Sequence, residues 1–222
     1  MQIINSVQKS ILESFGDLAD SDQFYLTGGT ALAYFYLHHR KSNDLDFFTS
    51  EEKIVTSFSL KLEDILRARK LTVERTRGIH SFIELAVKDR HESTIVQLAQ
   101  DAAFRFEVPR VFPEYPKLKV DGLLDIASNK LLALFGRAML RDFVDVYYLI
   151  KTGKFGQNDL IEKAKKKDPG FDLYWLGVAF ERIKTFDANS PEIHLLAEPL
   201  KLSDLASFFE TWKRQIEQNL KK

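Results

Sequence analysis

Cysteine is missing from this sequence of 222 residues, and its absence excludes three kinds of chemistry. No disulfide can form, no thiolate can act as a nucleophile, and no zinc ion can be held by cysteine. The five histidines have none of the spacings that are typical of zinc ligands. We therefore do not expect a zinc site built on histidine either.

Net charge and long apolar runs are missing as well. The 32 basic and 32 acidic residues cancel, which excludes a uniformly positive surface that would attract nucleic acid or anionic lipid. No stretch reaches the roughly 20 apolar residues that span a bilayer, and the first residues do not resemble a signal peptide. We therefore expect a cytoplasmic protein without a membrane partner.

The hydrophobic pattern changes at a cluster of prolines, Pro109, Pro113 and Pro116. Before this cluster, helical and strand-like patterns alternate, whereas every later pattern is helical. The sequence thus predicts an α+β fold: a mixed-sheet domain over residues 1–112 and an all-helical domain over residues 113–222. Predicted strands cover residues 23–27, 45–48, 71–77, 81–88 and 94–99, the last three as an antiparallel meander, and predicted helices cover residues 3–15, 30–38, 51–69, 121–135, 142–151, 159–167, 172–185 and 203–220.

Large aromatic side chains recur at helical spacing in the second half. Because such spacing is typical of a buried helix face, we interpret them as core of the helical domain and not as a platform for stacking bases. They are Trp175, Phe180, Phe208, Phe209 and Trp212.

Two short motifs in the first half carry the strongest chemical signal. Gly28 and Gly29 lie between a predicted strand and a predicted helix, where the backbone can approach a ligand and the helix N-terminus favours a phosphate. Asp44 and Asp46 are two residues apart on a predicted strand, so both point to one face and can share divalent cations. Together the motifs predict a site for metal-bound phosphate.

Each motif also has a simpler interpretation. A Gly-Gly pair is often a tight turn, and an Asp-x-Asp pair is often a solvated strand end. Asp44 and Asp46, however, run directly into the apolar residues Phe47 and Phe48, where unpaired carboxylates are costly, and this favours a metal. Thr30, Arg40 and Ser42 are candidates for phosphate contacts, with capping, an ion pair to the aspartates and a turn as the respective alternatives.

At this point the residues resemble a known family. The pattern Gly-Gly-Thr-Ala-Leu, followed by His39-Arg40-x-Ser42-x-Asp44-x-Asp46-Phe47-Phe48, is similar to the AbiEii/AbiGii toxins, a branch of the DNA polymerase β-like nucleotidyltransferases. A second block resembles the Lys-to-Asp motif of the same family. It reads Lys130-x-x-Ala133-Leu134-x-x-Arg137-x-x-x-Arg141-Asp142-x-x-Asp145-x-x-x-Leu149.

The resemblance implies a polymerase β-like domain whose nucleotide lies in a cleft against the helical domain. It implies transfer of a nucleoside monophosphate from an NTP to a hydroxyl, with pyrophosphate leaving and Mg2+ or Mn2+ held by Asp44 and Asp46. The biological role would be that of a growth-inhibiting toxin with a cognate antitoxin, and RNA such as tRNA would be the acceptor. Nothing in the residues themselves identifies the base or the acceptor.

The second block supports this interpretation on its own residues. If the helix is continuous, Lys130, Arg137 and Arg141 line one face and can meet a triphosphate. Asp142 and Asp145 would then orient these cations, the base or the acceptor. The alternative is an ordinary helix surface with an Arg141–Asp145 pair that contributes a few tenths of a kcal/mol.

One position departs from the pattern of the fold. By resemblance, a third carboxylate should fall at Gln97, but glutamine is neither an anionic ligand nor a general base. Either Glu84 or Asp101 replaces it, or the transfer chemistry is weakened. One rival function is therefore a nucleotide-binding module that acts by binding RNA or a partner protein. The other is a purely structural or interaction protein, which would show no metal-dependent binding of NTP.

The balanced net charge conceals blocks of opposite sign. Residues 17–52 contain 7 acidic and 2 basic residues, whereas residues 130–167 contain 9 basic and 4 acidic ones. Bound divalent metal would offset the acidic block. The basic block could receive a triphosphate or an RNA backbone, with salt-sensitive binding as its signature.

Overall fold

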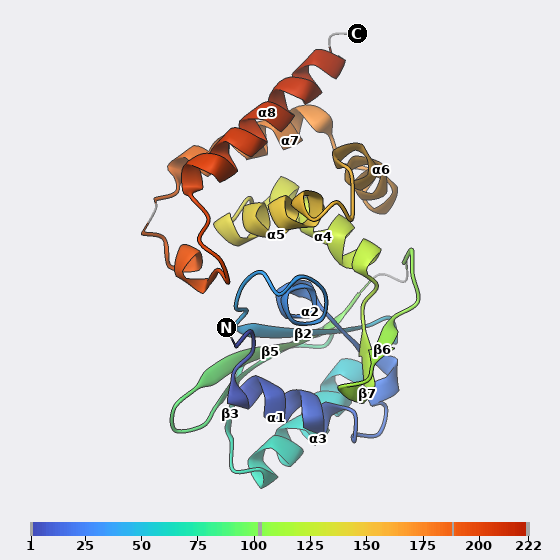
Figure 1. Cartoon of the computed structure of the whole chain (residues 1–222). Coiled ribbons are helices and arrows are strands. Elements are labelled where there is room, and N and C mark those ends of the chain that lie inside the picture. Colours follow the sequence, from blue (N-terminus) through green and yellow to red (C-terminus); the bar gives the residue numbers. More distant parts are fainter. Residues whose placement is uncertain (1, 102–103, 188, 221–222) are drawn as a thin grey trace. The chain divides into compact units, whose positions relative to one another are not determined.

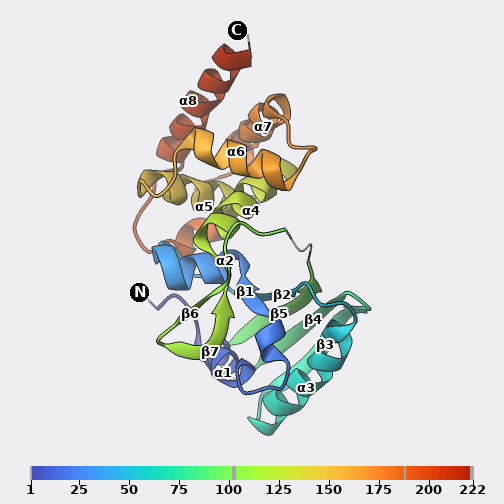
Figure 2. The ribbon, with the colours of Figure 1, turned by 90° about the vertical axis from the view of Figure 1, so that its right-hand side faces the viewer.

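A seven-stranded sheet organises the first of two units into which the chain divides, Met1–Leu123 and Leu124–Lys222 (Figure 1). The computed structural model describes residues 2–101, 104–187 and 189–220. The strand order is β3-β4-β5-β2-β1-β7-β6, with β3 and β6 at the two edges (Figure 2). The strands are β1 (Tyr25–Thr27), β2 (Asp44–Thr49), β3 (Thr72–Ile79), β4 (Phe82–Lys88), β5 (Ser93–Gln100), β6 (Arg110–Phe112) and β7 (Tyr115–Val120).

The sheet is mixed, and this confirms the predicted fold class. Strand β2 runs parallel to β5 and β1 runs parallel to β7, while all other neighbours are antiparallel. The predicted meander is present as β3, β4 and β5. Because β2 joins this meander through β5, the aspartate motif lies near the middle of the sheet.

Strands β6 and β7 were not predicted. Proline donates no N–H and is therefore disfavoured inside a sheet, so Pro113 and Pro116 obscured the pattern. In the structure, Pro113 lies between the two strands, and Pro116 follows Tyr115, where the register of the pair shifts. Both strands belong to the first unit.

Helices cover the two faces of the sheet differently (Figure 1). On one face lie α1 (Ser6–Phe15) and α3 (Ile54–Ala68), and on the other lies the short α2 (Gly28–Ala31), which continues as the π-helical η2 (Leu32–Leu37). Beneath α1 and α3 the core is aromatic: the rings of Phe15 and Phe47 stack with centroids 3.8 Å apart. The face under α2 is the one on which polar side chains gather.

The second unit is helical, as predicted. Its elements are α4 (Leu123–Gly136), α5 (Leu140–Lys151), α6 (Gln157–Lys167), α7 (Leu173–Phe180), η3 (Glu181–Thr185), η4 (Pro191–Leu195) and α8 (Leu202–Leu220), with α4 beginning at the unit boundary. In the described part of the chain, no helix has the length and apolar character needed to cross a membrane.

Most of the predicted aromatic core is present, but one member was assigned wrongly. Phe180, Phe209 and Trp212 are buried between α7 and α8, and Phe208 is half-buried beside them. Trp175 is 60% exposed, and its ring contacts that of Tyr174 edge to face. Helix α7 packs on α8 through its other side, so helical spacing identified an apolar helix but not which side is covered.

Candidate functional site

Strand β2 carries both aspartates of the motif on the face under α2. Its side chains alternate, with Leu45 and Phe47 fully buried and Asp44 and Asp46 half-buried. Phe47 stacks on α1, and successive strand residues point to opposite faces. The two carboxylates therefore lie together on the face away from α1, as their spacing predicted.

Gly28 brings the glycine turn into direct contact with this face. Thr27 is opposite Asp46 in the antiparallel pair of β1 and β2, so the turn begins where the carboxylate projects. Gly28 has a φ of +73°, and a Cβ at this position would lie 2.0 Å from Oδ2 of Asp46. Only glycine combines this backbone conformation with the absence of a side chain. The two motifs thus form one site.

Thr30 fixes the turn to the aspartate strand. Its side chain is fully buried, and its hydroxyl donates to the backbone carbonyl of Asp44. This bond joins α2 to the first residue of β2. Thr30 therefore holds the two motifs together through its side chain, and its backbone N–H lies in the first turn of α2.

Arg40 and Ser42 lie in the segment that leads into β2, and both are buried. Nη1 of Arg40 donates to the carbonyl of Lys41 at 2.9 Å. The carbonyl of Ser42 accepts a hydrogen bond of 2.9 Å from Nε2 of Gln8 in α1. The hydrogen bond from Gln8 thus fixes this segment to α1 just before the aspartates.

Three polar side chains form a row across the sheet from β2 to β4. Asp46 is paired with Gln97 on β5, and Gln97 is paired with Glu84 on β4. Nε2 of Gln97 donates to Oε2 of Glu84 at 3.0 Å. Glu84 also accepts a hydrogen bond of 2.8 Å from the hydroxyl of Thr76 and lies 3.6 Å from Nε of Arg77. Gln97 therefore separates the two carboxylates of the row.

Asp101 lies at a different place on the same face. It follows the last residue of β5, four residues beyond Gln97 and so about 13 Å along the strand. Its Oδ2 accepts a hydrogen bond of 2.9 Å from the hydroxyl of Tyr25. Of the two candidates for a replacement carboxylate, Glu84 is the one in the row of Asp46.

A network around Asp121 was not found by sequence reasoning. Asp121 is 1% exposed, and its carboxylate accepts hydrogen bonds from the hydroxyl of Thr27 at 2.7 Å and from Nη1 of Arg105 at 2.5 Å. The guanidinium carbon of Arg105 lies 3.4 Å from the ring centroid of Tyr25. No local signal pointed to this network, because Thr27 and Asp121 are 94 residues apart.

In the second unit, Lys130 forms a buried ion pair. Its Nζ lies 2.8 Å from Oδ2 of Asp145, with the two side chains 9% and 0% exposed. A comparable pair joins Lys167 to Asp125 at 2.8 Å, and Nζ of Lys167 also donates to Oδ1 of Asn129 at 2.9 Å. Lysines 130 and 167 thus project from α4 and α6 onto carboxylates that are fully buried.

Lys130 and Arg141 do not lie on one continuous helix, and the break falls between the two predicted helices, residues 121–135 and 142–151. Helix α4 ends at Gly136, Ala138 has a φ of +46°, and α5 begins at Leu140. Asp142 holds this break together, because its carboxylate accepts two hydrogen bonds of 2.9 Å from Arg137 and one of 3.1 Å from the N–H of Met139. Arg141 is half-buried in the first turn of α5.

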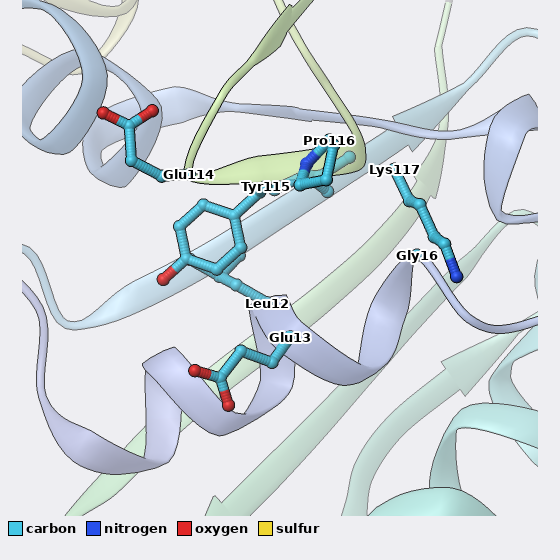
Figure 3. Close-up of a pocket in the computed structure, with 8 residues that line it drawn as sticks. Leu12, Glu13, Gly16, Glu114, Tyr115, Pro116 and Lys117 are labelled. Atoms are coloured by element: carbon cyan, nitrogen blue, oxygen red, sulfur yellow. The ribbon is translucent and has the colours of Figure 1, made fainter.

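A pocket of about 230 Å3 lies elsewhere in the first unit, between α1 and β7 (Figure 3). Glu13 and Glu114 project on the side of the Tyr115 hydroxyl (Figure 3). Burial raises the pKa of Tyr115 above its ordinary value, so the phenol is neutral near pH 7. Two carboxylates at its rim make this pocket unsuited to a nucleotide, and the polar face of the sheet remains the candidate site.

Within the described residues, no group of three or more histidine, cysteine, aspartate or glutamate side chains is arranged to hold a metal ion. Mg2+ is commonly bound through one or two carboxylates together with substrate phosphates and water. The donors on β2 match that pattern, and a cation there would complete its coordination with oxygens from outside the protein.

A protein-family model and a related protein match almost the whole chain. The model of the nucleotidyl transferase AbiEii toxin family of type IV toxin–antitoxin systems matches residues 10–222. The Aquifex aeolicus (strain VF5) protein aq_aa25 is 28% identical over 227 residues, which cover 99% of each chain.

Solved structures share the fold. A candidate nucleotidyltransferase from Helicobacter pylori matches with a TM-score of 0.60 and 21% identity over 97% of this chain and 93% of its own. The nucleotidyltransferase toxin MenT4 from Mycobacterium tuberculosis H37Rv matches with a TM-score of 0.51 and 16% identity over 96% of this chain and 89% of its own.

Proposed function

Because the chain belongs to the nucleotidyltransferase AbiEii toxin family, we propose that it transfers a nucleoside monophosphate from an NTP to a hydroxyl of an RNA acceptor such as tRNA, with Mg2+ or Mn2+ bound by Asp44 and Asp46. The observation that carries this proposal is the contact between the Gly28 turn and Asp46. It puts backbone N–H donors and a carboxylate pair at one place, which suits a metal-bound phosphate.

The carboxylates of Asp44 and Asp46 are the residues that would hold the cation. Both lie on the half-buried face of β2. Carboxylate oxygens are hard ligands, and such ligands favour Mg2+ over softer metal ions. When bound, the cation neutralises the charge that develops on the phosphoryl oxygens. Gly28, Gly29 and Thr30 would supply backbone N–H groups at the start of α2 to the oxygens that the cation does not reach.

Lys130 is the proposed ligand of the triphosphate in the helical unit, and Asp145 is its positioning residue. The ion pair of 2.8 Å fixes the ammonium group in a site with almost no solvent, so its three donors are oriented before substrate arrives. Asp142 and Arg137 would stabilise the turn between α4 and α5. For Arg40, Ser42 and Arg141, contact with the nucleotide stays a prediction.

The transfer step requires a base for the attacking hydroxyl. The acceptor oxygen forms a bond to the α-phosphorus, the bond to the β-phosphate bridging oxygen breaks, pyrophosphate leaves, and the hydroxyl proton must be accepted. Gln97 occupies the position in register with Asp46, and an amide cannot accept this proton efficiently. Glu84, the next carboxylate in the row, is the proposed acceptor of this proton.

Transfer of label from radioactive NTPs to RNA tests the proposal. Each of the four α-labelled NTPs is incubated with the protein, Mg2+ and total RNA. We expect label in RNA with at least one NTP, and its loss both with Asp46→Asn and on addition of EDTA. Labelling that persists in Asp46→Asn would count against Asp46 as the residue that holds the metal, and labelling that is absent with all four NTPs and with Mn2+ would count against an enzyme. An adjacent gene for an antitoxin would support the toxin role.

A second candidate function is favoured by Gln97. A nucleotide-binding module with weakened transfer activity would keep the turn and Asp44 but would lack a carboxylate in register with Asp46. It predicts that Mg-NTP raises Tm without transfer of label to RNA. A ligand present at 100 times its Kd adds about 2.7 kcal/mol to the free energy of unfolding, so a thermal shift detects such binding.

A further inference from the structure

Arg105 lies on the same face of the sheet as Asp46. In the antiparallel pair of β1 and β2, Tyr25 is opposite Phe48 and Thr27 is opposite Asp46, and opposite residues point to the same face. The guanidinium of Arg105 covers the ring of Tyr25 at 3.4 Å. Tyr25 is two residues before Thr27, or about 7 Å along the strand. Arg105 therefore lies within the reach of a substrate bound at Asp46.

A buried carboxylate fixes this arginine in place. Oδ1 of Asp121 accepts a hydrogen bond of 2.5 Å from Nη1 of Arg105, and Oδ2 accepts one of 2.7 Å from the hydroxyl of Thr27. The N–H of Asp121 donates to the carbonyl of Leu26 at 2.8 Å, which fixes Asp121 itself. The same carboxylate thus orients the guanidinium and the residue that precedes the Gly28 turn.

The guanidinium retains donors for a ligand. It has five N–H groups, and in the described part of the chain it makes one hydrogen bond, to Asp121. Its Nη2 is 3.7 Å from Oδ2 of Asp101, which is too long for a hydrogen bond. The side chain is 18% exposed. A group that is rigidly held, always charged and only partly satisfied is suited to bind phosphate oxygens.

We propose that Arg105 binds a phosphate group of the substrate and that Asp121 is its positioning residue. The inference rests on the proposed function, since it takes the substrate to be bound at Asp46. The phosphate belongs either to the NTP or to the backbone of the RNA acceptor, and both sources present the same chemistry. A purely structural role, in which the ion pair fastens the segment after β5 to the sheet, predicts changes in stability without changes in binding.

Binding measurements with two probes separate the sources. Calorimetry with Mg-ATP and each other NTP tests the nucleotide phosphates, and anisotropy with a labelled single-stranded RNA of 12 nucleotides tests the backbone. Arg105→Ala and Arg105→Lys remove the bidentate donor, and Lys keeps a charge beside Asp121 so that the fold is preserved. Arg110→Ala, an exposed arginine on β6, is the matched control.

We expect both Arg105 variants to weaken binding at least tenfold for one probe, and Arg110→Ala to change neither probe more than twofold. If the RNA is affected, the slope of log Kd against log salt should fall by about 0.7, the value for one phosphate of a single strand. Thr27→Val removes the hydrogen bond from the Thr27 hydroxyl to Asp121 but leaves the guanidinium of Arg105 in place. Its affinity for the probes should therefore change less than that of Arg105→Ala.

Unchanged binding of both probes by a folded Arg105→Lys protein would overturn the inference while leaving the proposed function intact. Wild-type protein that binds neither probe would overturn both. If Arg105→Ala does not fold, the binding measured with Arg105→Lys decides the question alone. The Tm of Arg105→Lys, compared with that of Thr27→Val, shows that this variant is folded.

Discussion

The carboxylate of Asp46 lies so close to Gly28 that a Cβ on the glycine would be 2.0 Å from Oδ2. This distance makes the turn and the aspartate strand a single structural feature. It also means that the residue at position 28 controls the position of a carboxylate proposed to hold metal.

Gly28→Ala should therefore abolish metal-dependent NTP binding. The added methyl must displace Asp46, and the left-handed backbone adds a strain of about 1–3 kcal/mol. Gly153→Ala is the matched control, because Gly153 has a similar φ of +70° and nothing within 4 Å of a Cβ. Both variants share the backbone strain, Gly28→Ala should lose more stability in urea because of the clash with Asp46, and only Gly28→Ala should lose the thermal shift with Mg-NTP. Equal thermal shifts in the two variants would contradict the proposed role of the contact.

The buried pair of Lys130 and Asp145 should be far more costly to break than an exposed pair. Lys130→Met leaves the carboxylate of Asp145 buried without its partner and should lower the free energy of unfolding by about 3–5 kcal/mol. The exposed pair of Lys165 and Glu162, 3.5 Å apart, should contribute about 0–1 kcal/mol. Urea titrations of Lys130→Met, Asp145→Asn and their double variant measure the coupling. A loss below about 1 kcal/mol for Lys130→Met would show that water reaches the site.

Gln97→Asp should strengthen metal binding. The new carboxylate would lie in register with Asp46, and a higher ligand charge raises the affinity for divalent cations. We expect the Kd for Mn2+, measured by EPR, to fall by about tenfold. Asp101→Asn is the control and should leave this Kd unchanged, because Asp101 lies beyond the end of β5. A weaker Mn2+ site in Gln97→Asp would exclude Asp46 as a ligand on this face.

The contact between Glu92 and α1 should make stability depend on pH. Hydrogen bonds from the hydroxyl and the backbone N–H of Ser6 hold the pKa of Glu92 below its ordinary value of 4.5. Because the folded pKa is lowered, the stabilisation is complete above about pH 4.5 and is lost as the pH falls through the folded value.

Glu92→Gln should therefore lower Tm at pH 6 and flatten the dependence of Tm on pH below about 4.5. Ser6→Ala keeps the backbone donor and should give an intermediate profile. Scanning calorimetry across this pH range measures both variants, and a Glu92→Gln profile parallel to that of the wild type would exclude this contact as a source.

The two tryptophans should respond differently to a quencher. Trp175 is 60% exposed and Trp212 is 1% exposed, and the chain contains no other tryptophan. Acrylamide should quench most of the emission of Trp212→Phe and little of that of Trp175→Phe. Equal quenching constants would mean that α7 is covered in solution. The same variants measure burial energy, since Trp212→Phe should cost about 1–3 kcal/mol by packing loss and Trp175→Phe about 0.5 kcal/mol or less.

The sequence by itself determined the features that depend on neighbours in the chain. Side-chain alternation placed Asp44 and Asp46 on one face because a strand has a period of two. The glycine pair predicted a turn before a helix, and apolar spacing located the helices of the second unit. The motifs also identified the family, since Lys130 and Asp145 follow the aspartates in the expected order.

Only the tertiary structure decided which distant residues meet. Strand pairing brought Asp46 beside Gln97. It also brought Asp121, which follows β7, to Thr27, and Arg105, which precedes β6, to Asp121. The prolines had obscured both β6 and β7. The tertiary structure also left Trp175 exposed. The reason is physical: hydrophobic periodicity reports which residues share a face, whereas register and burial depend on the partner that each face finds during folding.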